Sequence, residues 1–270
     1  TQSRSSAASD VYKRQVDAIL RDSLGKTRDS IHPPEQLADF WKGLFSRESP
    51  LDNRPLTDRR QQIPEIDNPI TESEVAASLK RAKEAATGPD GVPLKHLREI
   101  GSTALAILYN GLFCLQKIPQ SWKEARTVLI PKNDPPTSPG DYRPITISSY
   151  YYRIYTSTIG KRIADSIPLS DRQKGFTKTD GIRDNLVILE TLLEDAKRSS
   201  SSLHLTFMDV KKAFDSVSHH AIDRTLEWAG VPNGMRSVIA DLYRDCTTNI
   251  CGIKIGITRG VKQGDPLSST

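Results

Sequence analysis

The segment from Phe207 to Asp215 contains the clearest candidate for chemistry. Apolar residues on both faces of the preceding run, 203–210, predict a strand that is buried in the centre of a sheet. An ionised Asp209 near the end of such a strand must be paired, hydrogen-bonded or metal-bound, because an isolated buried charge is costly. One interpretation is that it caps the next turn or pairs with Lys211 or Lys212. The other is that it binds magnesium together with a neighbouring main-chain carbonyl.

A second candidate is the run from Arg259 to Ser268, in which Gly260 and Gly264 are separated by a short polar stretch. Glycines at such positions permit close approach of the backbone to a ligand. Ordinary turn chemistry explains the same residues equally well. By itself, this run therefore leaves a ligand site and a structural turn both open.

Two basic residues lie upstream, Lys132 in Leu129–Lys132 and Arg143 in Gly140–Ile145. An arginine can bind a phosphate through two hydrogen bonds, whereas a lysine acts as a point charge. Taken singly, each is more often a solvated surface cation than a phosphate ligand. Their order relative to the two runs above is what favours a shared site.

The first run resembles motif A of reverse transcriptases. The resemblance implies that Asp209 and the carbonyl of Val210 bind catalytic Mg²⁺ ions. It places Phe214 beneath the incoming sugar, where the ring would clash with a ribose 2′-hydroxyl. Asp215 would be structural, fixing the turn or capping the following helix.

The other runs resemble further motifs of the same family, in the same order. Arg259–Ser268 is similar to motif B, which implies that Gln263 and Gly264 lie under the nucleotide and the template base. The upstream segments are similar to the finger motif, which implies that Lys132 and Arg143 reach the triphosphate of a dNTP.

Two further stretches resemble the next finger motif of the family, which lies along the template strand. They are Gly175-Phe176-Thr177 and the Asp184-Asn185 pair. This implies template contacts from Gly175, Phe176 and Asn185. The turn 87–91 resembles one found ahead of the fingers in retroelement enzymes. It is not a P-loop, because it lacks the Gly-Lys-Ser/Thr ending and a preceding strand.

Together these motifs cover residues 71–269 and are most similar to non-LTR retrotransposons, in particular elements that insert into ribosomal RNA genes and carry a restriction-like endonuclease. The resemblance implies an α+β right-hand polymerase, with fingers, an incomplete palm and a helical N-terminal extension. The intact parent would carry out target-primed reverse transcription in the nucleus, using an RNA template and a DNA primer.

The sequence also departs from the family pattern. It ends before the later hairpin with the Ala-Asp-Asp carboxylates, and the thumb and endonuclease are absent. Two-metal catalysis holds its ions about 3.5 to 4 Å apart between shared carboxylates. We therefore expect this chain to be inactive alone, with an unpaired strand edge beside Asp209. The link 248–259 is shorter than expected, which suggests a small deletion or an error in assembling the sequence.

Two other hypotheses remain open at this stage. The chain could be a non-catalytic RNA-binding module derived from a reverse transcriptase, or a decayed fragment of an element. The joint presence of Asp209, Phe214, Gln263 and Lys132 argues against long relaxation of the catalytic site.

The domain division predicted from these patterns has three parts. Residues 1–15 are Ser/Ala-rich and are excluded as non-native or disordered, 16–112 form the helical extension, and 113–270 form the reverse transcriptase domain. A capping box at Thr71–Glu74 and a cap at Ser218 predict two helix starts, and periodicity gives the other elements, including a helix with a row of leucines on one face (Leu105, Leu108, Leu112 and Leu115). The predicted helices cover 34–45, 71–86, 103–116, 181–197, 218–229 and 233–246, and two further strands cover 126–130 and 253–257.

The remaining chemically interesting side chains favour structural roles. His219 and His220 are expected at the surface or at a helix cap. Cys246 and Cys251 are expected to be thiols that are buried or have no chemical role, and the core is expected to contain Trp41, Trp122 and Trp228. The residues Tyr150, Tyr151 and Tyr152 fit core packing at least as well as base stacking.

Composition gives weaker constraints. The 270 residues carry a net charge of +5, which mildly favours a polyanionic partner, and only three cysteines, too few for a disulfide scaffold. No stretch reaches the roughly 20 apolar residues of a membrane span, so a membrane association is not expected.

Overall fold

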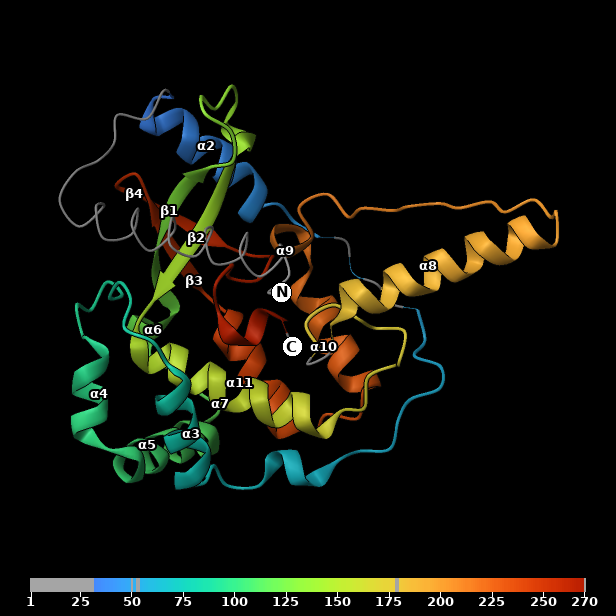
Figure 1. Ribbon diagram of the computed structural model, residues 1–270. Coiled ribbons are helices and arrows are strands. Elements are labelled where there is room, and N and C mark those ends of the chain that lie inside the picture. The colour runs from blue at the N-terminus through green and yellow to red at the C-terminus, as the bar shows by residue number, and fades with distance from the viewer. Residues whose placement is uncertain (1–31, 50, 52–53, 178–179, 270) are drawn as a thin grey trace.

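A four-stranded mixed sheet and a helical lobe form the body of the molecule (Figure 1). The computed structural model describes residues 32–49, 51, 54–177 and 180–269. The predicted non-native segment 1–15 lies outside them. This mixed architecture agrees with the predicted α+β class and is compatible with fingers and part of a palm.

The sheet has the strand order β2-β1-β3-β4. β1 (Glu124–Pro131) pairs antiparallel with β2 (Tyr142–Ser148) and parallel with β3 (Cys246–Ile250). β4 (Ile253–Ile257) pairs antiparallel with β3. The predicted strands correspond to β1 and β4, whereas β2 and β3 were not predicted.

The short link between β3 and β4 forms a regular hairpin. Ile250 pairs with Ile253, and the two residues between them, Cys251 and Gly252, have φ angles of 52° and 87°. Two successive positive φ angles are typical of the tight turns that match the twist of antiparallel strands. The shortness of the link is therefore accounted for by a two-residue turn.

Helix α2 (Pro34–Phe45) covers part of the sheet and confirms the first predicted helix. Its apolar side chains pack against strand residues that lie far away in the sequence. The cluster contains Leu37, Ala38, Trp41, Phe45, Tyr142, Ile250 and Ile255.

Helix α3 (Glu72–Arg81) starts with the predicted capping box: the Glu74 backbone N–H donates to Thr71 Oγ1 (3.3 Å), and the Thr71 N–H to the Glu74 carboxylate (2.8 Å). The prediction that this helix continues to Ala86 is wrong. Beyond Arg81 the backbone turns away, and the Ala85 N–H donates to Tyr150 Oη at 2.6 Å. A tertiary contact thus replaces the next helical turn.

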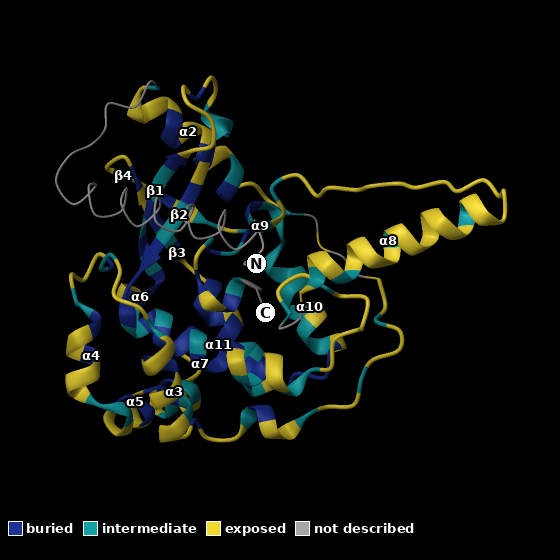
Figure 2. Ribbon diagram, viewed as in Figure 1, coloured by how far each residue is buried: buried dark blue, intermediate teal, exposed yellow. Residues whose placement is uncertain are grey.

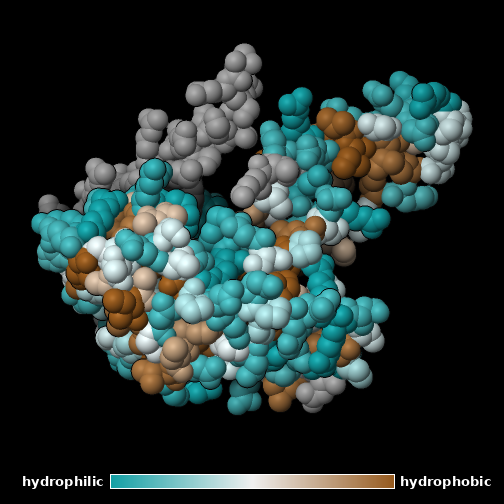
Figure 3. All heavy atoms as spheres, turned by 90° about the horizontal axis from the view of Figure 1, so that it is seen from below, coloured by the Kyte–Doolittle hydropathy of each residue, from teal (hydrophilic) through white to brown (hydrophobic). Residues whose placement is uncertain are grey.

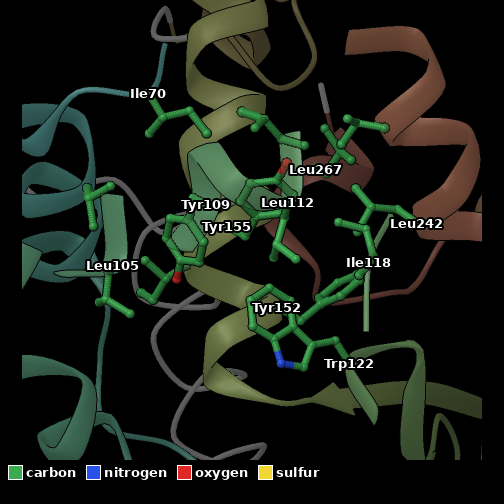
Figure 4. Packing of buried hydrophobic residues seen from close by; sticks show 14 of the residues in the cluster. Ile70, Leu105, Tyr109, Leu112, Ile118, Trp122, Tyr152, Tyr155, Leu242 and Leu267 are labelled. Carbon is green, nitrogen blue, oxygen red and sulfur yellow. The ribbon is translucent and has the colours of Figure 1, made fainter. Parts of the chain in front are cut away.

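Around α3, further helices enclose the main apolar core (Figure 4). They are α4 (Leu94–Ile100), α5 (Ser102–Leu115), α7 (Tyr150–Ser166) and α11 (Asn233–Tyr243). Neither α4 nor α7 was predicted. The predicted end of the last helix at Cys246 is wrong, because that residue already belongs to β3.

The buried face of α5 differs from the predicted row of leucines. Leu105 and Leu112 are buried, but Leu108 and Leu115 are 40% and 70% exposed. Tyr109 is fully buried instead and faces the neighbouring Tyr155, with 5.0 Å between ring centres. The predicted domain boundary between residues 112 and 113 falls inside this helix, so the division of the chain into domains stays a prediction.

Helix α8 (Gly181–Arg198) confirms a predicted helix, yet it has no buried residue. It projects from the body (Figure 1), and its apolar residues are exposed (Figure 2). In the space-filling view, brown side chains gather on this arm (Figure 3). Residues with at least 46% exposure are Ile182, Leu186, Val187, Ile188, Leu192 and Leu193.

The prediction of a central, buried strand over 203–210 is wrong. These residues form neither helix nor strand, and Phe207 and Met208 are 83% and 92% exposed. The alternation fits a sheet covered on both sides, but burial requires neighbours. No neighbouring strand in the described parts of the chain pairs with this segment.

The remaining helices are short. Ser218 caps α10 (His219–Trp228) as predicted, because its Oγ accepts a bond from the Ala221 N–H at 3.1 Å. Trp228 is 36% exposed and stacks against Arg60, so its assignment to the core is wrong, whereas Trp41 and Trp122 are buried. The others are α6 (Gln120–Lys123), α9 (Ala213–Ser216), η1 (Pro64–Asp67), η2 (Pro139–Asp141) and η3 (Pro266–Ser269).

Among the described residues, no helix combines the length and apolarity that a crossing of the lipid bilayer requires.

Candidate functional site

The turn that follows Asp209 packs directly against the run 259–268. The Val261 N–H donates to the Phe214 carbonyl, and the Gly260 N–H to the Val217 carbonyl, both at 2.7 Å. At Gly260, φ is +80°, and an added Cβ would lie 2.8 Å from the Asp215 carbonyl oxygen. Both the conformation and the close approach therefore require glycine there.

Asp215 joins the two runs through its side chain. It is 4% exposed, and Gln263 Nε2 donates to its Oδ1 at 2.7 Å. Burial raises the pKa of Asp215, while the Gln263 hydrogen bond and the charges of Lys212 and Lys132 oppose that rise. The backbone N–H of Asp215 also donates to the Lys212 carbonyl at 3.0 Å, which closes the turn.

Gln263 and Gly264 lie against the sheet. The Thr146 N–H in β2 donates to the Gln263 carbonyl at 3.1 Å. Gly264 has a φ of +99°, and the nearest atom to an added Cβ would be the Thr146 carbonyl oxygen at 3.7 Å. Glycine is thus favoured here by the backbone conformation and not by crowding.

The finger residue Lys132 lies just beyond β1, near the same turn. Its backbone N–H donates to the Asp141 carbonyl at 2.7 Å and its Nζ to the Gly140 carbonyl at 3.0 Å. Its charge opposes the rise that burial causes in the pKa of Asp215. Arg143 is exposed and lies opposite Ile130 in the strand register, at the same end of the β1–β2 pair.

The structure does not bring the predicted metal ligands together with other carboxylates. Asp209 is exposed, and Val210 is 70% exposed. No group of three or more His, Cys, Asp or Glu side chains suited to a metal occurs among the described residues. These residues alone therefore do not fit a two-ion site.

The predicted template residues lie in the loop before α8 and on the first part of α8. Phe176 has a φ of +58° and is 73% exposed, and its ring lies edge-to-face against Phe214, 6.0 Å between centres. Gly175 precedes it, and its carbonyl accepts a bond from Gln173 Nε2 at 3.0 Å. Asn185 lies exposed near the start of α8, and its neighbour Asp184 accepts a bond from Lys174 Nζ at 3.1 Å, which ties this part of the helix to the segment before Gly175.

Phe214 also forms part of the wall of an apolar pocket of about 290 Å³. The pocket lies between the turn after Asp209, α10, α11 and the run 259–268. Other lining residues include Val217, Ile222, Tyr243, Val261 and Leu267. The site thus has an apolar side next to its charged side.

Sequence reasoning missed the buried pair Lys262 and Asp265 beside Gln263. Lys262 Nζ lies 3.9 Å from the centre of the Tyr152 ring, and Asp265 accepts bonds from Thr156 Oγ1 (2.6 Å) and Tyr152 Oη (3.3 Å). Burial lowers the pKa of Lys262 and raises that of Asp265. The sequence feature that could have indicated this pair is the presence of two charged residues on either side of Gln263-Gly264.

His219 was expected at the surface or in a cap, and it begins α10 with a side chain that is partly buried. Its ring stacks on Tyr243 with 4.7 Å between centres, and Nε2 donates to the Gly260 carbonyl at 2.9 Å. Burial lowers the pKa of His219. Its contacts support the Gly260 turn.

The turn 87–91 is attached to the start of α7. The Gly91 N–H donates to the Gly88 carbonyl at 3.1 Å, and an added Cβ at Gly88 would lie 2.5 Å from the Ser149 nitrogen. Arg153 donates to the Ala86 carbonyl at 2.8 Å. The predicted turn therefore exists, and glycine permits its close contact with α7.

The order of these segments can now be compared with known proteins. Residues 130–270 match the family described as "Reverse transcriptase (RNA-dependent DNA polymerase)". The chain belongs to the reverse transcriptase family. The sequence-based recognition of a retrotransposon reverse transcriptase is confirmed, and the enzyme class follows from the family.

The relatives are polyproteins of mobile elements. The chain is 31% identical over 264 residues to a Pol polyprotein from the type-2 retrotransposable element R2DM of Drosophila melanogaster, covering 95% of this chain and 25% of the relative. It is 30% identical over 268 residues to one from an R2 element of Bradysia coprophila, covering 96% of this chain and 31% of the relative. A Popillia japonica R2 relative is 35% identical over 207 residues, covering 74% and 29%.

This reverse transcriptase chain thus spans about a quarter to a third of the length of these relatives. Reverse transcriptases generally use divalent metal ions. They copy a nucleic acid template from a primer, and in the relatives the domain is part of a polyprotein.

Proposed function

We propose that this chain forms the fingers and part of the palm of an RNA-directed DNA polymerase of an R2-like retrotransposon. The observation that supports it is the meeting of three distant segments at one place. Asp215 accepts the Gln263 hydrogen bond, and Lys132 lies near enough to influence its pKa. A shared nucleotide site explains why the three motifs converge.

In this proposal the parent protein extends a DNA primer on an RNA template. The primer 3′-oxygen attacks the α-phosphorus of a dNTP, and pyrophosphate leaves. Lys132 and Arg143 would bind the triphosphate, Gln263 and Gly264 would support the base pair, and Phe214 would exclude a 2′-hydroxyl.

Template binding in this proposal falls to the exposed residues near Phe214. Phe176 offers an exposed ring for stacking on a base, and Gly175 and Asn185 lie on either side of it in the sequence. For the parent element, the proposal includes insertion into ribosomal RNA genes by target-primed synthesis. The parent would therefore act in the nucleus.

Asp209 would supply one carboxylate of the magnesium site, with the Val210 carbonyl beside it. Among the described residues, Asp209 belongs to no group of three or more His, Cys, Asp or Glu side chains that could hold a metal ion. We therefore propose that a longer polypeptide supplies the remaining ligands, and that the 270 residues alone do not polymerise.

Primer extension on an RNA template, with dNTPs and Mg²⁺, tests this proposal. We expect no product from the 270 residues and template-dependent product from a longer chain that includes the following Ala-Asp-Asp hairpin. In the longer chain, Asp209→Asn should reduce the rate at least ~10³-fold, as expected for losing a ligand that organises charge stabilisation. The matched control, Asp171→Asn, changes an exposed carboxylate and should retain full activity.

Two results would contradict the proposal. One is robust synthesis by the 270 residues alone, which would show that no further ligands are needed. The other is a longer chain that binds RNA in a salt-dependent manner but neither binds nor incorporates dNTPs, which would instead indicate an RNA-binding module.

A further inference from the structure

Helix α2 lies outside residues 130–270, the part of the chain that matches the family, yet it contacts the turn after Asp209. The Nζ atom of Lys212 lies 4.5 Å from the ring centres of both Phe40 and Trp41. Trp41 is fully buried and Phe40 is 37% exposed, so the rings form a partly shielded cage.

The cage offers this lysine aromatic faces in place of water. Lys212 Nζ is buried and has no hydrogen-bond partner. Burial lowers the pKa of Lys212, while the charge of Asp215 counteracts that shift. A cation that has lost its water gains most from contact with aromatic faces.

The backbone of Lys212 adds to the argument. Its φ is +54°, a left-handed conformation that a residue with a Cβ adopts only when its surroundings hold it there. Lys212 lies between Asp209 and Phe214 in the sequence. Whatever holds its side chain therefore also sets the path of the turn that joins them.

The other end of α2 contacts the strand that leads into Gly260. The Thr258 N–H donates to the Phe45 carbonyl at 2.9 Å, and Arg259 Nε donates to the Leu44 carbonyl at 2.7 Å. One helix thus touches both of the segments that meet at Asp215.

We propose that α2 is a positioning element of the polymerase site. Phe40 and Trp41 hold Lys212 and thereby set the turn between Asp209 and Phe214, while the C-terminal end of α2 holds the entry to the run 259–268. The functional meaning of the turn rests on the proposed function, but its dependence on α2 does not.

Amide hydrogen exchange, followed by mass spectrometry on the 270-residue chain, tests this dependence directly. Lys212→Met removes the charge and keeps an unbranched side chain that is one atom shorter, and Phe40→Leu removes one ring. In both variants, peptides covering 209–217 should exchange at least ~3-fold faster, whereas peptides from α5 and α7 should be unchanged. Lys212→Arg retains a cation for the cage and should restore the wild-type rate.

The matched control is Lys211→Met, which makes the same change one residue earlier, at an exposed side chain. Equal exchange in the Lys212→Met and Lys211→Met variants would overturn the proposal. So would failure of Lys212→Arg to restore protection. Neither result depends on polymerase activity, so loss of the proposed function in primer extension remains a separate outcome.

Discussion

Helices α7 and α8 have almost the same length but opposite surroundings. α7 has 17 residues, nine of them buried, and α8 has 18 residues and none buried (Figure 2). Yet α8 has the more regular separation of apolar and polar faces. The comparison shows that an amphipathic pattern predicts a helix and a face that favours burial, but not the partner that covers it.

The same contrast holds for the strands. β1 is hydrogen-bonded on both edges, whereas 203–210, with apolar residues on both faces, has no strand partner among the described residues. Segments with strand neighbours are hydrogen-bonded into the sheet, whereas 203–210 is extended and exposed to solvent. The arm formed by α8 and 201–210 is therefore the part of the fold whose apolar side chains most need contacts with other segments or molecules to become buried.

The largest expected difference between the two helices is in stability. Ile159 in α7 is fully buried, so Ile159→Ala should lower the unfolding free energy by about 2–5 kcal/mol through lost burial and a residual cavity. Leu192 in α8 is 46% exposed, and Leu192→Ala should change it by less than about 1 kcal/mol. Urea denaturation followed by circular dichroism measures both, and equal losses would show that α8 is packed in solution.

A smaller effect is expected on self-association. The exposed apolar face of α8 should promote contacts between molecules. Leu193→Gln should raise the concentration at which light scattering detects association by about 2-fold or more, without changing the unfolding midpoint. Lys197→Gln on the same helix is the control, and an equal shift in that variant would show that the apolar face of α8 is not the cause of association.

The smallest expected effect is on the acid dependence of the unfolding free energy. It distinguishes the carboxylate of Asp241 in the body from that of Asp195 on α8. Burial alone would raise the pKa of Asp241, but hydrogen bonds from Lys123 and the Ile118 N–H outweigh it and lower that pKa below 3.8. The unfolded chain then binds the proton more readily, so this stabilisation is present above pH 3.8 and is lost as pH falls through the folded pKa.

Asp241→Asn should therefore remove part of the acid dependence of the unfolding free energy below about pH 4. Asp195 in α8 is exposed, and Asp195→Asn should leave the profile unchanged. Thermal unfolding across the acid range measures both. An unchanged profile in the Asp241→Asn variant would show that its ion pair with Lys123 does not form in solution.

Much of the secondary structure could be predicted, because its signals are local. The capping box at Thr71, the cap at Ser218 and the alternation in β4 each involve residues a few positions apart. Helix ends were less predictable: α3 stops early because Ala85 bonds to Tyr150, a residue 65 positions away. β2 and β3 were missed, because their pairing with β1 is not encoded in their own periodicity.

For the candidate site, the order of motifs was enough to predict which segments meet. It did not predict that Asp215 would be the side chain joining Gln263 to the turn, nor that Lys212 would lie in a cage from α2. These contacts depend on the packing of helices and strands that are distant in the sequence. Patterns within a single segment carry no information about them.

The sequence by itself determined the family, the motif order and most helices, since these depend on residue identity and short-range spacing. Only the tertiary structure decided which apolar faces are covered. Leu203, Phe207 and the apolar face of α8 satisfy every local rule for burial, yet they are exposed. Burial is a property of two surfaces, and the free energy of removing apolar area from water is gained only where the second surface is present.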